Sequence, residues 1–221
     1  TRAPPGEAAA SSRSTRVLAY VGSVGASFYN GPEGVTIHDV SDPTKPKKAA
    51  EVNATPGIHN HKLRVVGDDL LYANCERLNT PEGQGARAGI QIFDIGDPAN
   101  PKEVGFYDMP GNGPHRFGVD NERQLAFAPN EAEGWRDRVN WTLDISDPLK
   151  PWLLSLWGLP EQDLSLNLPY EKPEVWERVT TCRGLAVIRG DRMYCGFWGG
   201  GMGIADCSDL SNVKHISHLC W

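Results

Sequence analysis

The composition of this 221-residue chain already excludes several classes of protein. Apolar residues make up 39% and charged residues 23% of it, which predicts one packed domain or two small ones. The formal net charge of −6 offers no basic face for a phosphate backbone, so we expect no nucleic-acid partner. No run of about 18 apolar residues occurs, which predicts that no segment spans a membrane.

Short apolar or alternating stretches, separated by turns, follow one another along the chain. The 24 glycines and 17 prolines are spread through the sequence, a pattern typical of many short strands and not of long helices. Residues 1–16 precede the first regular repeat and are interpreted as a flexible or strand-completing segment. The predicted strands are 16–24, 34–40, 47–52, 62–69, 70–76, 90–95, 102–109, 116–123, 125–131, 140–144, 184–191, 192–198, 202–206 and 214–221.

One segment of about twelve residues recurs four times. The copies are VTIHDVSDPTKP (35–46), IQIFDIGDPANP (90–101), NWTLDISDPLKP (140–151) and the divergent MGIADCSDLSNV (202–213). The shared aspartate falls at Asp39, Asp94, Asp144 and Asp206, at spacings of 55, 50 and 62 residues. In each copy an apolar strand ends in Asp, and the next Asp with Pro forms a turn, because Pro fixes φ and cannot continue a ladder. The last copy lacks the Pro.

Each repeat unit of about 50 residues contains roughly four predicted strands and no amphipathic helix. Four antiparallel strands per unit of this length are typical of a β-propeller blade. The sequence therefore predicts an all-β chain of four-stranded antiparallel blades. The expected blades are approximately 17–56, 57–110, 111–180 and 181–221.

These repeats resemble those of the LVIVD-repeat β-propeller proteins, whose units combine an apolar strand, Asp-Val-Ser-Asp-Pro and a later Pro-Gly and His. The segments IHDVSDPTKP, IFDIGDPANP and LDISDPLKP carry the resemblance, together with HNHK and GPHR. It covers residues 17 to 219, nearly the whole chain. The resemblance implies the fold and leaves the chemistry open, because propellers host many activities.

The chain supplies about four blades, and the first of them lacks a clear innermost strand. Propellers have 4 to 8 blades, and the resemblance implies a larger ring. We therefore expect half of such a ring, completed by a second chain, a second copy or a segment lost from the sequence. A closed four-bladed ring is the alternative. In either case exposed sheet edges favour association.

Three histidines follow the Pro-Gly crossings from one blade to the next. His59 and His61 come after the first crossing and His115 after the second, which places them at one end of the central channel. Because strand side chains alternate, His59 and His61 are expected to point the same way. Three converging imidazoles are typical ligands of Zn, Fe, Mn or Cu, so a transition-metal site is predicted. A metal-free functional channel and a purely structural role are the alternatives.

Charged residues near the same crossings are candidates for catalysis. Arg116 and Arg183 suit a substrate carboxylate or phosphate, and pairing with Glu76 or Asp120 is the structural alternative. Glu76 ends a second strand and is a candidate general base, with solvation at the rim as the other interpretation. The long segment 157–179 lies on the same side and is interpreted as a lid or docking surface.

Two functions follow from this pattern. The first is a metal-dependent hydrolase or lyase that acts on a small anionic substrate in the axial channel, with His59, His61 and His115 as ligands. The second is a non-catalytic propeller that serves as an interaction scaffold. A cytoplasmic location is expected, with the periplasm and the exterior as alternatives, since no signal peptide is visible and the chain does not begin with Met.

Overall fold

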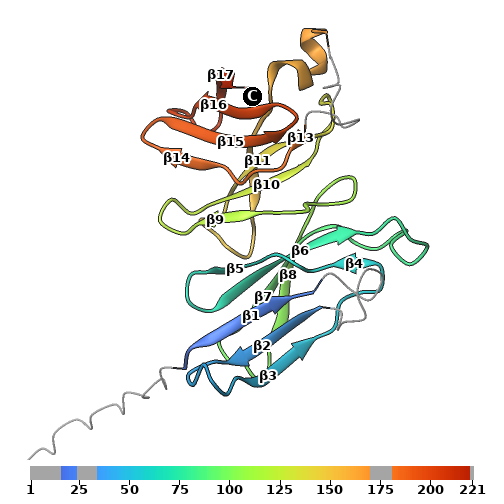
Figure 1. The fold of residues 1–221 in the computed structure, drawn as a ribbon, viewed down its shortest axis with the longest axis vertical. Coiled ribbons are helices and arrows are strands. Elements are labelled where there is room, and N and C mark those ends of the chain that lie inside the picture. Colours follow the sequence, from blue (N-terminus) through green and yellow to red (C-terminus); the bar gives the residue numbers. More distant parts are fainter. Residues whose placement is uncertain (1–15, 24–33, 170–180, 220–221) are drawn as a thin grey trace, which may run out of the picture.

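The structure, a computed structural model, describes residues 16–23, 34–169 and 181–219, and in these ranges it consists of four antiparallel sheets. Figure 1 shows the sheets stacked in chain order along the longest axis of the molecule. We call them blades 1 to 4. No helix of the described chain is long and apolar enough to cross a membrane.

Blades 1 and 2 are built from the first eight strands. Blade 1 contains β1 (Leu18–Gly22), β2 (Val35–Asp39) and β3 (Lys47–Val52). Blade 2 contains β4 (Ile58–His59), β5 (Leu63–Val66), β6 (Leu70–Arg77), β7 (Gly89–Asp94) and β8 (Lys102–Asp108).

Blades 3 and 4 are built from the remaining nine strands. Blade 3 contains β9 (Gly118–Asp120), β10 (Leu125–Glu131), β11 (Arg138–Asp144) and β12 (Trp152–Trp157). Blade 4 contains β13 (Thr181–Cys182), β14 (Val187–Arg189), β15 (Arg192–Trp198), β16 (Gly201–Asp206) and β17 (Lys214–Leu219). Two short 3-10 turns, η1 (Pro160–Gln162) and η2 (Leu164–Leu166), follow blade 3.

The strand order confirms the predicted antiparallel blades, because consecutive strands are neighbours in each sheet. In blades 2 and 4 the first strand is interrupted, so β4 and β5 both pair with β6, and β13 and β14 both pair with β15. Blade 1 has three strands among the described residues, and its missing member is the innermost one, as the sequence indicated. The chain before residue 16 and the segment 170–180, where the lid was predicted to continue, lie outside the described ranges.

The repeated aspartates fix the turns of the blades, as predicted. In all four blades a side-chain oxygen of the repeated aspartate accepts a hydrogen bond from the backbone N–H two residues later, at 2.7–3.0 Å. The four aspartates are Asp39, Asp94, Asp144 and Asp206. The strand that carries this aspartate also has a register shift against the outermost strand at the same place in each blade. The turn and the irregularity are therefore one local unit, repeated four times.

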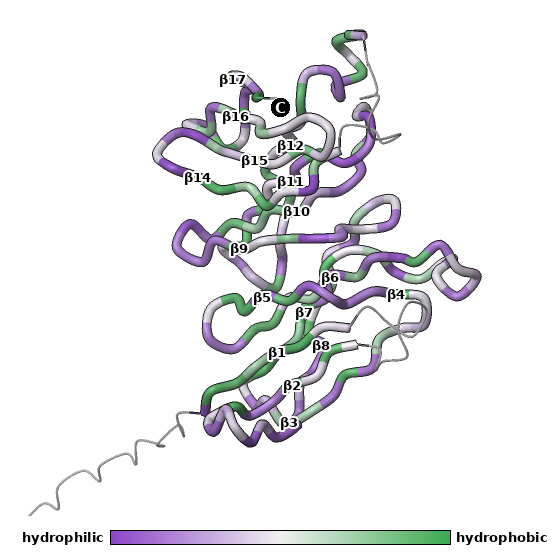
Figure 2. Tube along the Cα trace, in the orientation of Figure 1, coloured by the Kyte–Doolittle hydropathy of each residue, from purple (hydrophilic) through white to green (hydrophobic). Residues whose placement is uncertain are grey.

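Three apolar cores lie between consecutive blades and hold them together. Ile37 and Phe93 belong to the core between blades 1 and 2, and Ile90 and Leu143 to the core between blades 2 and 3. The core between blades 3 and 4 includes Phe127 and the cysteines Cys182 and Cys195. Figure 2 shows green apolar strands within the sheets and purple polar hairpins at their ends.

Hydrogen bonds also cross from blade 2 to blade 3. The hydroxyl of Tyr72, a fully buried residue, donates to the backbone carbonyl of Pro148 in the Asp-Pro turn of the next blade. The side chain of Asn121 bonds Gly67 N and Val65 O, both at 3.2 Å, and so links the first hairpins of the two blades. The first strands β5 and β9 consequently lie side by side, as strands that line a common hub do.

The turn aspartates make the fold sensitive to acid. Backbone hydrogen bonds from Ser41 and Ser208 hold the pKa values of Asp39 and Asp206 below their ordinary range. A carboxyl whose pKa is lowered by folding stabilises the native state above its unfolded pKa, about 3.9, and loses that contribution as the pH falls through the folded pKa. We expect the contribution of these two carboxyls to the urea midpoint of unfolding to stay level from about pH 7 to 5 and to be lost below about pH 4.

The matched control is the double variant Asp39→Asn/Asp206→Asn, which keeps an acceptor oxygen in each turn and cannot titrate there. Its midpoint should fall less between neutral and acidic pH. An identical loss in both proteins would contradict this role of the two carboxyls.

Candidate metal centre

A break in the first strand of blade 2 positions two of the predicted histidines. His59 in β4 pairs with Glu76, whereas Leu63 in β5 pairs with Ala73, so the segment between them holds one residue more than the opposing strand. The rings of His59 and His61 lie together, with centroids 5.3 Å apart. Their proximity was predicted from regular alternation, but the reason is different, because the strand is irregular between them.

Asn74 fixes both histidine-bearing segments. Its Oδ1 accepts a hydrogen bond from Lys62 N at 2.8 Å, directly after His61. Its Nδ2 donates to the carbonyl of Pro114 at 3.0 Å, directly before His115. Asn74 is fully buried in the middle of β6, so one amide side chain holds the two crossings at a fixed separation.

Glu76 lies at the centre of the histidine cluster. Its Oε2 is 2.6 Å from His115 Nδ1 and 3.5 Å from His59 Nδ1, and its Oε1 is 3.0 Å from Nη2 of Arg138. His61 completes the group, with its ring centroid 4.7 Å from that of His115. Arg138 opens β11 of blade 3, so the cluster bridges two blades.

The carboxyl of Glu76 is held in the ionised form. Burial alone would raise its pKa, but hydrogen bonds from His115, His59 and Arg138 outweigh burial and hold the pKa well below its usual range. A buried carboxylate with a guanidinium partner is a fixed negative charge at the point where the imidazoles meet. Such a charge suits a cationic ligand.

Both ring nitrogens of His61 are buried and have no hydrogen-bond partner in the described part of the chain. Burial, with a smaller effect from His115, lowers the pKa of His61 to about 4. The imidazole is therefore neutral at physiological pH, which is the form that binds metals. Leaving two buried ring nitrogens unsatisfied costs free energy, so this ring is the one most in need of a ligand.

The donor atoms fit a metal ion. One ligand atom from each of His59, His61 and Glu76 lies within 4.8 Å of the others. Two imidazoles and a carboxylate are a known ligand set for catalytic zinc and for non-haem iron, and both leave positions open for water or substrate. In this arrangement His115 contacts the carboxylate of Glu76 and orients it.

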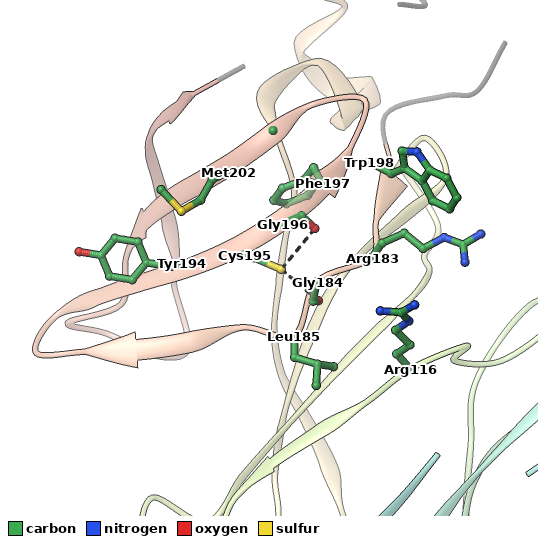
Figure 3. Close-up of a pocket in the computed structure, with 11 residues that line it drawn as sticks. Arg116, Arg183, Gly184, Leu185, Tyr194, Cys195, Gly196, Phe197, Trp198 and Met202 are labelled. Carbon is green, nitrogen blue, oxygen red and sulfur yellow. Dashed lines mark hydrogen bonds between the residues drawn. The ribbon is translucent and has the colours of Figure 1, made fainter. Parts of the chain in front are cut away.

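The structure thus brings together four of the six predicted site residues: His59, His61, His115 and Glu76. Arg116 and Arg183 lie elsewhere, in the lining of a cavity of about 550 Å³ beside blade 4. Figure 3 shows their side chains on one side of that cavity, with Arg183 next to Trp198. The guanidinium carbon of Arg183 is 4.8 Å from the Trp198 ring centre, a cation–π contact.

The ion pairs suggested for the two arginines are formed by other residues. Glu76 pairs with Arg138, and Asp120 pairs with Arg123 at 2.9 Å. Sequence reasoning missed Arg138 and Asn74. Arg138 lies 62 residues from Glu76 in another blade, and no local signal marks that contact. Asn74 was within reach, since a polar residue in the middle of the apolar strand LLYANCE must find partners when buried.

Comparison with known proteins supports the repeat architecture. The model of the LVIVD repeat family matches residues 86–109 and 185–217. These two segments carry the LVIVD repeat. The matched segments include β7 with β8 in blade 2 and β14 to β16 with the first part of β17 in blade 4. No curated protein matches the chain.

Two solved structures share its fold. One is a protein from Lactobacillus plantarum, 16% identical, with a TM-score of 0.62 over 93% of this chain and 53% of the other. The second is the periplasmic gluconolactonase PpgL of Pseudomonas aeruginosa, 11% identical, with a TM-score of 0.61 over 91% of this chain and 55% of the other. The chain spans about half the length of both structures, and the β-propeller fold is the likeness that they share with it.

The contacts of Asn74 predict that its side chain stabilises the two segments that carry His61 and His115. Asn74→Ala leaves the buried Lys62 N–H and the Pro114 carbonyl without their partner, so the free energy of unfolding should fall by about 2 kcal/mol or more. Urea denaturation followed by tryptophan fluorescence measures this change. Asn100→Ala, an exposed turn residue, is the control and should change stability by less than about 0.5 kcal/mol. Equal effects of the two substitutions on the free energy of unfolding would contradict the role of Asn74 in holding the two histidine-bearing segments.

Proposed function

We propose that this chain contributes a metal-dependent enzymatic centre to a β-propeller, with hydrolysis as the first reaction class and elimination as the second. One observation carries the proposal: among the residues that the structure describes, the buried nitrogens of His61 have no hydrogen-bond partner, and one of its ligand atoms lies within 4.8 Å of those of His59 and Glu76. A structural histidine would be expected to satisfy its nitrogens with backbone or side-chain groups.

The residues divide into ligands and supporting groups. His59, His61 and Glu76 would hold the ion, a divalent transition metal such as zinc or iron. When bound, such an ion polarises a carbonyl and lowers the pKa of a water molecule. His115 orients the Glu76 carboxylate at 2.6 Å, and Arg138 offsets its charge from the other oxygen at 3.0 Å. Outer-shell contacts of this kind fix the ligand geometry.

The positions of Arg116 and Arg183 support the proposal that the substrate is a small anion. Arg116 follows His115 directly in the chain, and Arg116 and Arg183 both line the cavity beside blade 4, where they are available to bind an anion. Arginine binds carboxylates with two parallel hydrogen bonds, which also orients the bound molecule. The fold likeness to a gluconolactonase supports hydrolysis as the first choice.

Metal binding tests the proposal. Chelator-treated protein should take up one zinc ion per chain in a competition titration, and His61→Ala should weaken binding by about 100-fold or more. His38→Ala is the matched control, because His38 is a half-buried histidine on β2 that bonds Thr36 instead of the cluster. A folded protein that binds no zinc, iron, manganese or copper would favour the non-catalytic scaffold.

We also propose that a second copy of this chain completes the ring. Aligned on the shared aspartate, Tyr194 of blade 4 occupies the position of Tyr72 in blade 2 and Phe127 in blade 3. Those two are 0% and 3% exposed because the next blade covers them, whereas Tyr194 is half-buried. The open face of blade 4 also carries Val187 and Leu219, exposed at 46% and 59%. The two solved propellers extend beyond the part that this chain matches, which supports further blades beside blade 4.

The oligomeric state tests the second copy. Light scattering on the purified chain should give twice the monomer mass, and Tyr194→Asp should shift the population to monomer because a charge would be buried at the seam. Val104→Asp is the control, since Val104 is an exposed apolar residue of β8. A wild-type chain that remains monomeric at high concentration would overturn pairing between copies.

A further inference from the structure

Two thiols in blade 4 lie unusually close together. The Sγ atoms of Cys182 in β13 and Cys195 in β15 are 3.3 Å apart, and the residues are 0% and 2% exposed. The two strands are paired and antiparallel, with Cys182 opposite Phe197. Cys75, also buried, lies instead beside the amide groups of Asn60 and Gln91.

A pair of glycines allows this approach. A Cβ atom on Gly184 would lie 2.5 Å from the backbone nitrogen of Gly196, so a side chain at Gly184 would force the strands apart. The N–H groups of Arg183 and Gly184 both donate to the carbonyl of Gly196, which bends the chain around the thiols. The carbonyl of Gly184 in turn faces Cys195 Sγ at 3.3 Å. A disulfide bond is about 2.05 Å long, so the sulfur atoms need to approach by only about 1.3 Å.

Only one of the two cysteines lines the cavity beside blade 4. Cys195 contributes to its wall together with Gly184 and Gly196, whereas Cys182, with its Sγ 3.3 Å from that of Cys195, is not among the lining residues. Figure 3 shows the Cys195 sulfur between these two glycines, next to the cavity. In a chain whose blade 4 is not covered by a second copy, this cavity gives a small oxidant access to Cys195 first, and Cys182 lies close enough to react second.

We propose that Cys182 and Cys195 form a redox-active dithiol that a hydroperoxide converts to a disulfide. In the first step the Cys195 sulfur attacks hydrogen peroxide, giving a sulfenic acid and one water molecule. In the second step the Cys182 sulfur attacks that sulfenic acid, forms the S–S bond and releases a second water. Two thiols lose two electrons and two protons, and the peroxide takes them up. The reaction does not involve the histidine cluster.

Thiol counting and mass spectrometry test this inference on the intact reduced chain, after treatment with a chelator to exclude metal-catalysed oxidation. The five cysteines of the sequence should all be alkylated before peroxide treatment, and two should be lost afterwards, with a mass decrease of about 2 Da. Dithiothreitol should restore all five. Trypsin should then release a cross-linked pair of peptides, 179–183 and 193–214.

The second peptide contains both Cys195 and Cys207, so the variants decide between them. Cys207→Ser, which removes a buried cysteine of the same peptide, should still form the cross-link. Cys195→Ser should lose no thiol on peroxide treatment. A cross-link that uses Cys207 or Cys220, or a wild-type chain that keeps five thiols after oxidation, would overturn the inference.

Discussion

The structure depends on the burial of each sheet against the next. A four-stranded sheet with apolar side chains on both faces cannot shield itself, and the three cores of this protein all lie between consecutive blades. Blades 2 and 3 each contribute to two cores, whereas blades 1 and 4 each contribute to one. The hub positions of β5 and β9, the bridging of Glu76 to Arg138 and the open face of blade 4 all follow from this stacking.

Within that stack, the candidate centre is a local departure from regular sheet structure. The break between β4 and β5 gives up ladder hydrogen bonds, and the side chains of Asn60 and Asn74 replace them. This replacement leaves His61 in a buried, polar gap where its imidazole stays neutral. Irregular backbone at the hub therefore provides ligand atoms that a continuous strand would direct elsewhere. Binding sites often occur where a stable framework supports a short irregular segment.

Most of the fold was predictable from the sequence because each repeat is defined by contacts between residues that are close together in the chain. Asp39 and its three equivalents bond a backbone group two residues away, and such contacts are visible in any single copy. The meeting of His59, His61 and His115 was also predictable, since all three follow a crossing to a first strand. The roles of the residues within the cluster were not predictable. Glu76 pairs with Arg138 from the next blade, whereas the sequence suggested Arg116 or Arg183. Contacts of that kind depend on the angle between blades, which no short pattern encodes.

The register shift beside each Asp turn has a consequence for how such a protein can change in evolution. Because the irregularity, the turn and the following strand occur together in every blade, each unit brings its own curvature with it. Copying one unit within a gene would add a blade whose faces already fit its neighbours. Chains with different numbers of units could then arise by duplication or loss without new packing solutions, and chemistry could diverge separately at each hub-facing segment.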